Sequence, residues 1–169
     1  NECSRFSLCF EKGYCVTAED VEKVLAHNRE ESAYTLFDAI CDVEKSPSQR
    51  LSLGLEILEK IRQTKDGSSV SIIVRLSYCF RRLLVWYALH EEGNPSDFDL
   101  KIKGFSSKKA QNLYRGAARI WSNRDTVTIL ALLSQGDMTI RTTGTSVENI
   151  TLQTILYSII MKNGKPLDT

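Results

Sequence analysis

The residues from Ser68 to Gly93 constrain the fold more than any other part of this 169-residue chain. Apolar side chains recur there at alternating steps of three and four residues, the spacing of one helix face: Ile73, Leu76, Phe80, Leu83 and Tyr87. A second set recurs at every seventh residue on an adjoining face: Ile72, Cys79 and Trp86. A helix that is apolar almost all the way round is buried by neighbours on several sides. Its longest uninterrupted apolar run, Leu83–Leu89, is far short of the ~20 residues that cross a membrane. The sequence therefore predicts a central core helix of a soluble helical domain, with no membrane partner.

The composition is that of an ordinary globular protein, with 42% hydrophobic and 25% charged residues and a net charge of +1. A chain this close to neutrality gives no general reason to expect nucleic acid as its main partner, although local basic patches are compatible with it. The first residues resemble the middle of a helix and carry no secretion signal, so we expect a C-terminal piece of a longer protein. Five cysteines without a CxxC pair predict reduced thiols in a cytoplasmic protein.

Helix start and stop signals divide the chain into about seven helices. Ser46-Pro47-Ser48-Gln49 combines an N-cap serine, a proline at the first helical position and a glutamine that completes a capping box. Similar signals open helices at Ser122 and Thr145, and Gly93-Asn94-Pro95 ends the central helix. Residues 96–105 are ambiguous, and their apolar side chains are expected to be buried: Phe98, Leu100, Ile102 and Phe105. The predicted fold is all-α, an irregular helical bundle, with a polar break separating an N-terminal remnant (1–29) from the main domain (30–169).

The sequence offers little for catalysis. His27 and His90 each stand near the end of a predicted helix, where an imidazole commonly stabilises the helix. Three cysteines lie six residues apart, which matches no tetrahedral zinc site: Cys3, Cys9 and Cys15. No phosphate-loop, dinucleotide, zinc-protease or nucleophile-elbow motif is present. We therefore expect no catalytic residue, cofactor or metal and no enzyme activity, and we keep a reactive Cys15 only as a third hypothesis.

Three arginines interrupt the central helix: Arg75, Arg81 and Arg82. One interpretation is an internal ion pair with a carboxylate such as Asp38, Glu56 or Glu59, with the long stem lying along apolar surface. The other is a subunit interface, where arginine and tryptophan are favoured anchors. The candidate interface residues are Arg75, Arg81, Arg82 and Trp86.

A second basic group clusters on one predicted helix: Lys108, Lys109, Arg115 and Arg119. The helix could be the second of a helix-turn-helix unit that reaches phosphates or a groove of DNA. The opposite face carries an ordinary core stripe, so the same residues also suit a solvated or protein-contacting surface: Ala110, Leu113, Ala117 and Ile120. Both interpretations stay open at this point.

Three segments, in order, resemble the delta subunit of the bacterial DNA polymerase III clamp loader. The first is NECSRFSLCF followed by VTAEDVEKVLAHNREESAYTLFDAI, the second is VRLSYCFRRLLVW, and the third runs from GFSSKKAQNLYRGAARIWS through LALLSQGDMTIRTTG to the last helix. The residues that fit the family's helix starts are Val16, Thr17, Glu19, Asp20, Val21, Phe37, Asp38 and Ala39. Asp137 and Arg141 stand where the family has an acidic residue and a lysine before a glycine. The departures are a leucine displaced by one residue (Leu36), the cysteine-rich first segment and the polar stretch 94–104.

The resemblance implies that residues 1–29 end a small helical lid domain and that residues 30–169 form the helical collar. Collars of this family assemble with those of the delta-prime and gamma/tau subunits in a ring during DNA replication. The family contacts the sliding clamp through an N-terminal domain that this chain lacks, and the collar reaches DNA only through the assembled complex. The full protein would be a subunit of the DNA polymerase III holoenzyme, a DNA-directed DNA polymerase. The alternative is a helical nucleic-acid-binding module that uses the basic helix around Lys108–Arg124.

Overall fold

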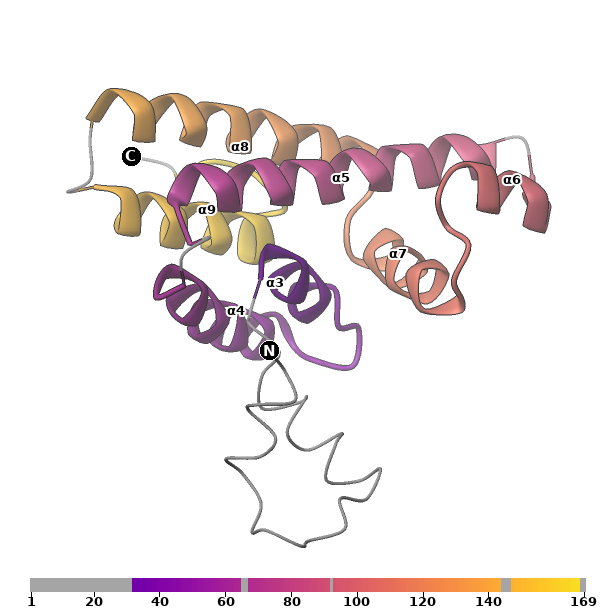
Figure 1. Cartoon of the computed structure of the whole chain (residues 1–169), viewed down its shortest axis with the longest axis horizontal. Helices are drawn as coiled ribbons and strands as arrows, with labels where there is room; N and C mark the ends of the chain where they lie inside the picture. The colour runs from indigo at the N-terminus through magenta and orange to yellow at the C-terminus, as the bar shows by residue number, and fades with distance from the viewer. Residues whose placement is uncertain (1–31, 65–66, 92, 144–146, 168–169) are drawn as a thin grey trace, which may run out of the picture. The chain divides into compact units, whose positions relative to one another are not determined.

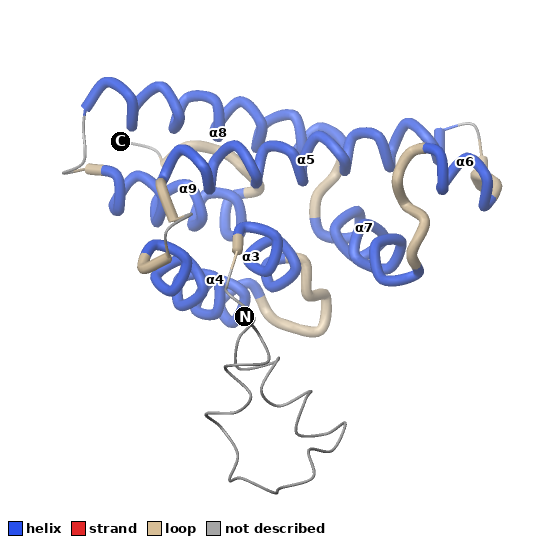
Figure 2. Tube along the Cα trace, viewed as in Figure 1, coloured by secondary structure: helices blue, strands red, loops and turns tan. Residues whose placement is uncertain are grey.

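The computed structural model describes residues 32–64, 67–91, 93–143 and 147–167. The chain divides into two units, Asn1–Glu30 and Glu31–Thr169, and every described residue belongs to the second. These residues form seven helices and no strand, which confirms the predicted all-α bundle (Figure 2). The helices predicted within residues 1–29 lie outside the described residues.

The first two described helices begin at capping boxes. In α3 (Ala33–Ile40) the Ser32 hydroxyl accepts from the backbone N–H of Thr35. In α4 (Pro47–Arg62) the Ser46 hydroxyl accepts from the backbone N–H of Gln49 at 3.3 Å, and the Gln49 side chain accepts from the N–H of Ser46 at 3.0 Å. This is the predicted start of the helix, and such a cap typically contributes about 1 kcal/mol.

Two long helices form the centre of the described unit. α5 (Ser69–Glu91) and α8 (Asn123–Thr143) lie side by side and run in opposite directions (Figure 1). α9 (Glu148–Lys162) packs against both of them and against α4, and α3 packs against α4 and α5. None of the helices in the described ranges is both long and apolar enough to span a membrane.

α6 (Asp97–Ile102) and α7 (Lys108–Ile120) follow the C-terminal end of α5. Leu100 and Phe105 are buried as predicted, but Phe98 is 70% and Ile102 is 63% exposed, so their predicted burial is wrong. The physical reason is that α6 is only six residues long and turns the Leu100 side inward. Phe98 and Ile102, four residues apart, share the opposite side.

The last helix begins differently from the prediction. α9 starts at Glu148 after Val147, which makes no side-chain cap hydrogen bond, and the predicted cap residue Thr145 lies outside the described residues. The Glu148 carboxylate instead accepts a hydrogen bond of 2.7 Å from the hydroxyl of Ser69. This contact joins the first turns of α5 and α9.

Aromatic rings fill the core where α3, α5 and α7 meet. Phe80 lies 5.3 Å from Phe37 and 5.3 Å from Trp121, edge-on in both cases. The Trp121 indole N–H donates to the carbonyl of Ile159 at 3.0 Å, which satisfies a carbonyl in the last turn of α9. One fully buried side chain therefore links α5, α7 and α9.

Candidate protein-interaction surface

Trp86 and Arg82, both predicted as interface residues, make contacts within the protein, Trp86 in the core and Arg82 at the surface. Trp86 is only 4% exposed and packs against Phe105 with a ring distance of 5.2 Å. The Arg82 guanidinium lies 4.4 Å from the centre of the Phe105 ring and donates to the carbonyl of Gly104 at 2.7 Å. Trp86 therefore offers almost no surface to a partner, whereas Arg82 is partly exposed and is already engaged in these contacts. Arg82 therefore contacts aromatic rings and a backbone carbonyl, whereas the other interpretation predicted an internal ion pair with a carboxylate.

The other two arginines of α5 have different surroundings. Arg75 is half-buried and already contacts a neighbouring group of the protein. Arg81 is exposed and points away from the core. Of the four predicted interface residues, Arg81 is therefore the one that the structure leaves available to a partner.

Arg81 belongs to an exposed stripe along α5. Val74 is 55%, Tyr78 49% and Val85 37% exposed. With Arg81 these residues follow one another at steps of four, three and four, so they share one helix face. The core residues, such as Ile72, lie on the opposite side. The burial on several sides that the sequence predicts for this helix agrees with the packing of α3, α7, α8 and α9 against α5, and the stripe is a part of α5 that the described unit leaves exposed.

A matching stripe runs along α8. Val127 is 55% and Met138 67% exposed, with exposed Ala131 and Ser134 between them at the same helical spacing. A groove of about 180 Å³ separates the two stripes and is lined from both helices: Val74, Ser77 and Arg81 from α5, and Leu130, Ser134 and Asp137 from α8.

We call the two stripes and their groove the outer α5–α8 face, made of Val74, Tyr78, Arg81, Val85, Val127, Ala131, Ser134 and Met138. Arg81 is the one charged member of this set. Asp137, at the edge of the groove, is held by Arg141 at 2.9 Å. The α8 stripe was not predicted from the sequence. The spacing of its small and apolar residues at steps of four, three and four could have revealed it.

The predicted basic residues of α7 fall into two places. Lys108, Arg115 and Arg119 are exposed and share one face. Lys109 lies to the side, with its ammonium 3.5 Å from the Asp38 carboxylate of α3. The structure therefore brings together three of the four residues.

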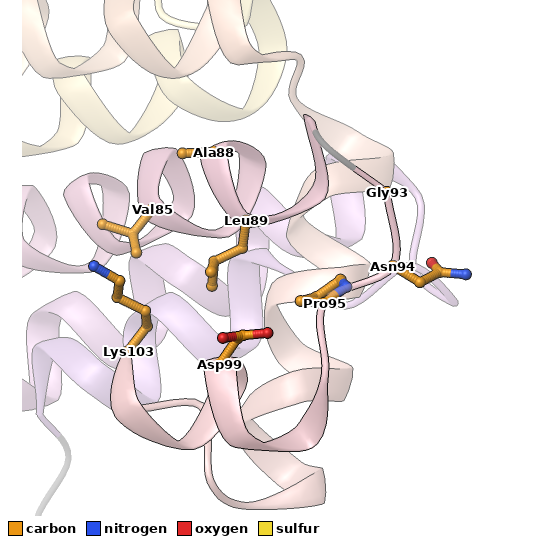
Figure 3. A pocket seen from close by; sticks show the side chains of 8 residues that line it. All are labelled: Val85, Ala88, Leu89, Gly93, Asn94, Pro95, Asp99 and Lys103. Atoms are coloured by element: carbon orange, nitrogen blue, oxygen red, sulfur yellow. The ribbon is translucent and has the colours of Figure 1, made fainter.

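A cleft of about 590 Å³ lies between the end of α5 and α6 (Figure 3). Val85 and Leu89 form its apolar side, and Lys103 extends from the end of α6 alongside Val85. Its carboxylate, Asp99, accepts hydrogen bonds from the N–H and hydroxyl of Ser96, which lower the pKa of Asp99. Because this carboxylate caps α6, the cleft is the joint between two helices.

The described thiols and imidazole are structural. Cys41 and Cys79 are buried, and burial raises the pKa of both, that of Cys79 to about 12, so neither forms a thiolate near pH 7. The His90 ring packs on Trp86, with Nδ1 2.7 Å from the Trp86 carbonyl oxygen. Within the described ranges, no group of three side chains is placed to hold a metal ion. Cys3, Cys9, Cys15 and His27 lie outside these ranges.

Neither a protein-family model, nor a curated protein, nor a solved structure matches the chain.

Proposed function

We propose that residues 30–169 form the helical collar of a bacterial DNA polymerase III delta subunit. In this proposal the collar is a non-catalytic, cytoplasmic module that assembles with the delta-prime and gamma/tau subunits. The order of the three family-like segments supports the identification. The observation that carries the role is the uncovered outer α5–α8 face.

The chemistry of this face suits a protein partner. Interfaces favour aromatic residues and arginine at their centre, and Tyr78 and Arg81 stand in the middle of the α5 stripe. Val74, Tyr78 and Val85 are roughly half exposed, so covering each of them stabilises a complex by about 1 kcal/mol. The groove of about 180 Å³ is smaller than most small-molecule sites.

The shape of the face favours a helix as the contacting element. Two antiparallel helices with a groove between them accept the ridge of a third helix. The complementary helix would carry an apolar stripe and a carboxylate positioned to meet Arg81. Collars of related subunits, built from amphipathic helices, are partners of this kind.

The collar would hold the subunits together while the loader places the sliding clamp on DNA. In the family, clamp contact belongs to a separate N-terminal domain. No clamp-contact residue is therefore assigned to the described residues.

The test is assembly with the expected partners. The chain is mixed at about 10 μM with the delta-prime and gamma/tau subunits of the same bacterium, and the mass of each species is measured by light scattering after gel filtration. We expect a species whose mass equals that of the joined subunits. Independent elution of all components would contradict the proposal, and an unrelated helical protein of similar size serves as the control.

A further inference from the structure

Positive charge is concentrated in one part of the chain. The residues from Leu100 to Arg124 include no aspartate or glutamate and seven basic residues: Lys101, Lys103, Lys108, Lys109, Arg115, Arg119 and Arg124. The rest of the chain has 15 basic and 21 acidic residues, a net charge of −6. A chain that is nearly neutral as a whole therefore contains one strongly basic sequence segment.

Three of these cations form a continuous stripe on α7. Lys108, Arg115 and Arg119 share the exposed face, and Asn112 lies between them, within reach of Arg115 at 2.9 Å. Tyr114 and Ala117 bury the opposite face. Within the described part of the protein none of the three cations is in an ion pair, so their charge is not neutralised by a neighbour.

We infer that this face of α7 binds the phosphate backbone of duplex nucleic acid. At 1.5 Å per residue the stripe is about 16 Å long, and B-DNA presents one phosphate charge per roughly 1.7 Å of its axis, so several phosphates lie within reach. Guanidinium groups bind phosphate oxygens in pairs, and amides such as that of Asn112 are common phosphate donors.

The same face favours a duplex over a single strand. Single-stranded nucleic acid is held largely by bases stacked on aromatic side chains. The α7 stripe contains no aromatic residue, since Tyr114 faces the core. Direct duplex binding departs from the indirect DNA contact that the family resemblance implies, and it rests on a different helix face from the one that carries the collar proposal.

The test is duplex binding as a function of salt. The full chain is titrated into a fluorescent 20-bp duplex at about 50–200 mM NaCl, and anisotropy gives the affinity. Three neutralised phosphates predict a slope of log K against log salt of about −2.7 or steeper. The triple variant Lys108→Gln, Arg115→Gln, Arg119→Gln should bind at least about tenfold more weakly at the lowest salt, with a much shallower slope.

A second triple variant controls for net charge. Lys45→Gln, Lys162→Gln and Lys165→Gln remove the same charge from other surfaces and should retain the wild-type slope. All six side chains are at least partly exposed, so helical circular dichroism should be unchanged in both variants. Equal losses in both variants would overturn the inference, as would no duplex binding at 50 mM salt. Tighter binding of a glutamate-rich peptide would assign the face to an acidic protein, and tighter binding of a single strand would also contradict the inference.

Discussion

Arg81 and Arg82 are neighbours in the chain with opposite environments. The Arg82 guanidinium stacks over Phe105 and donates to the Gly104 carbonyl, whereas Arg81 is exposed. Arg82→Glu places a carboxylate beside that carbonyl and removes the stacked cation, so we expect a loss of about 2 kcal/mol in the free energy of unfolding. Arg81→Glu should change it by less than about 0.5 kcal/mol. Urea denaturation of both variants checks this, and equal losses would show that the Arg82 contacts are unimportant.

Both the backbone conformation and the close packing at position 164 require glycine. Its φ is +86°, and a Cβ there would come within 2.8 Å of the backbone nitrogen of Ile129. Gly93 has a φ of +122° but no atom within 4 Å of such a Cβ, so it isolates the backbone contribution. Gly164→Ala should cost about 2–4 kcal/mol, and Gly93→Ala about 1–2 kcal/mol. Thermal unfolding of both variants measures the two losses of stability. A larger loss for Gly93→Ala than for Gly164→Ala would contradict the packing role of Gly164.

The two buried thiols should make the free energy of unfolding fall as the pH becomes alkaline. Burial raises the pKa of Cys79 from 9.0 to about 12 and raises that of Cys41 as well. Because the folded pKa is the higher one, this contribution is complete below about pH 9 and is lost as pH rises towards 12. Each pH unit in that window costs about 1.4 kcal/mol per thiol. The free energy of unfolding measured from pH 8 to 10.5 should fall more steeply for the wild type than for Cys41→Ala, Cys79→Ala; parallel curves would contradict this.

At the scale of elements, Trp121 connects α7 to the last turn of α9. Its indole N–H donates to the Ile159 carbonyl, and its own carbonyl accepts from the Tyr87 hydroxyl of α5. Trp121→Phe leaves a buried carbonyl without a donor and leaves a small cavity, so we expect a loss of about 2–4 kcal/mol. Chemical denaturation followed by circular dichroism measures this loss. Tyr87→Phe, which keeps the ring volume, should cost only about 1 kcal/mol, and the reverse order would refute the role given to Trp121.

Local signals predicted the helix starts well because a cap involves residues only three apart. Ser46 with Gln49 and Ser122 with Asp125 form the hydrogen bonds expected of their sequences. The predicted cap of α9, Thr145, lies outside the described residues, and α9 begins at Glu148, whose carboxylate is engaged by Ser69, 79 residues away. Burial also depends on contacts between residues that are far apart in the sequence. For this reason Phe98 was predicted to be buried, although α6 turns it outward.

The interaction surface was only partly predictable for a related reason. The apolar character of α5 on several sides is visible in the sequence, but periodicity does not tell whether the same chain or a partner covers a given side. Adjacent arginines differ by about 100° around the helix, which is enough to put Arg82 against the core and Arg81 in solvent. Trp86, the most interface-like residue by type, is a core residue for the same geometric reason.

At the scale of the whole molecule, the described unit presents two surfaces of different chemistry. The outer α5–α8 face is apolar with one arginine, and the α7 stripe is basic without an aromatic residue. We propose that the first joins the collar to its neighbours and that the second meets a phosphate backbone. Substitutions on one face should leave the function of the other unchanged.

We propose that assembly with the delta-prime and gamma/tau subunits depends on the outer α5–α8 face, and a pair of double variants tests this. Tyr78→Glu with Val74→Glu places two charges on the outer α5–α8 face. Phe98→Glu with Ile102→Glu places two charges on side chains that are more exposed but lie on α6. Light scattering of each variant with the partner subunits should show the complex lost or weakened at least about tenfold for the first pair and retained for the second. Equal assembly of both variants would contradict the account.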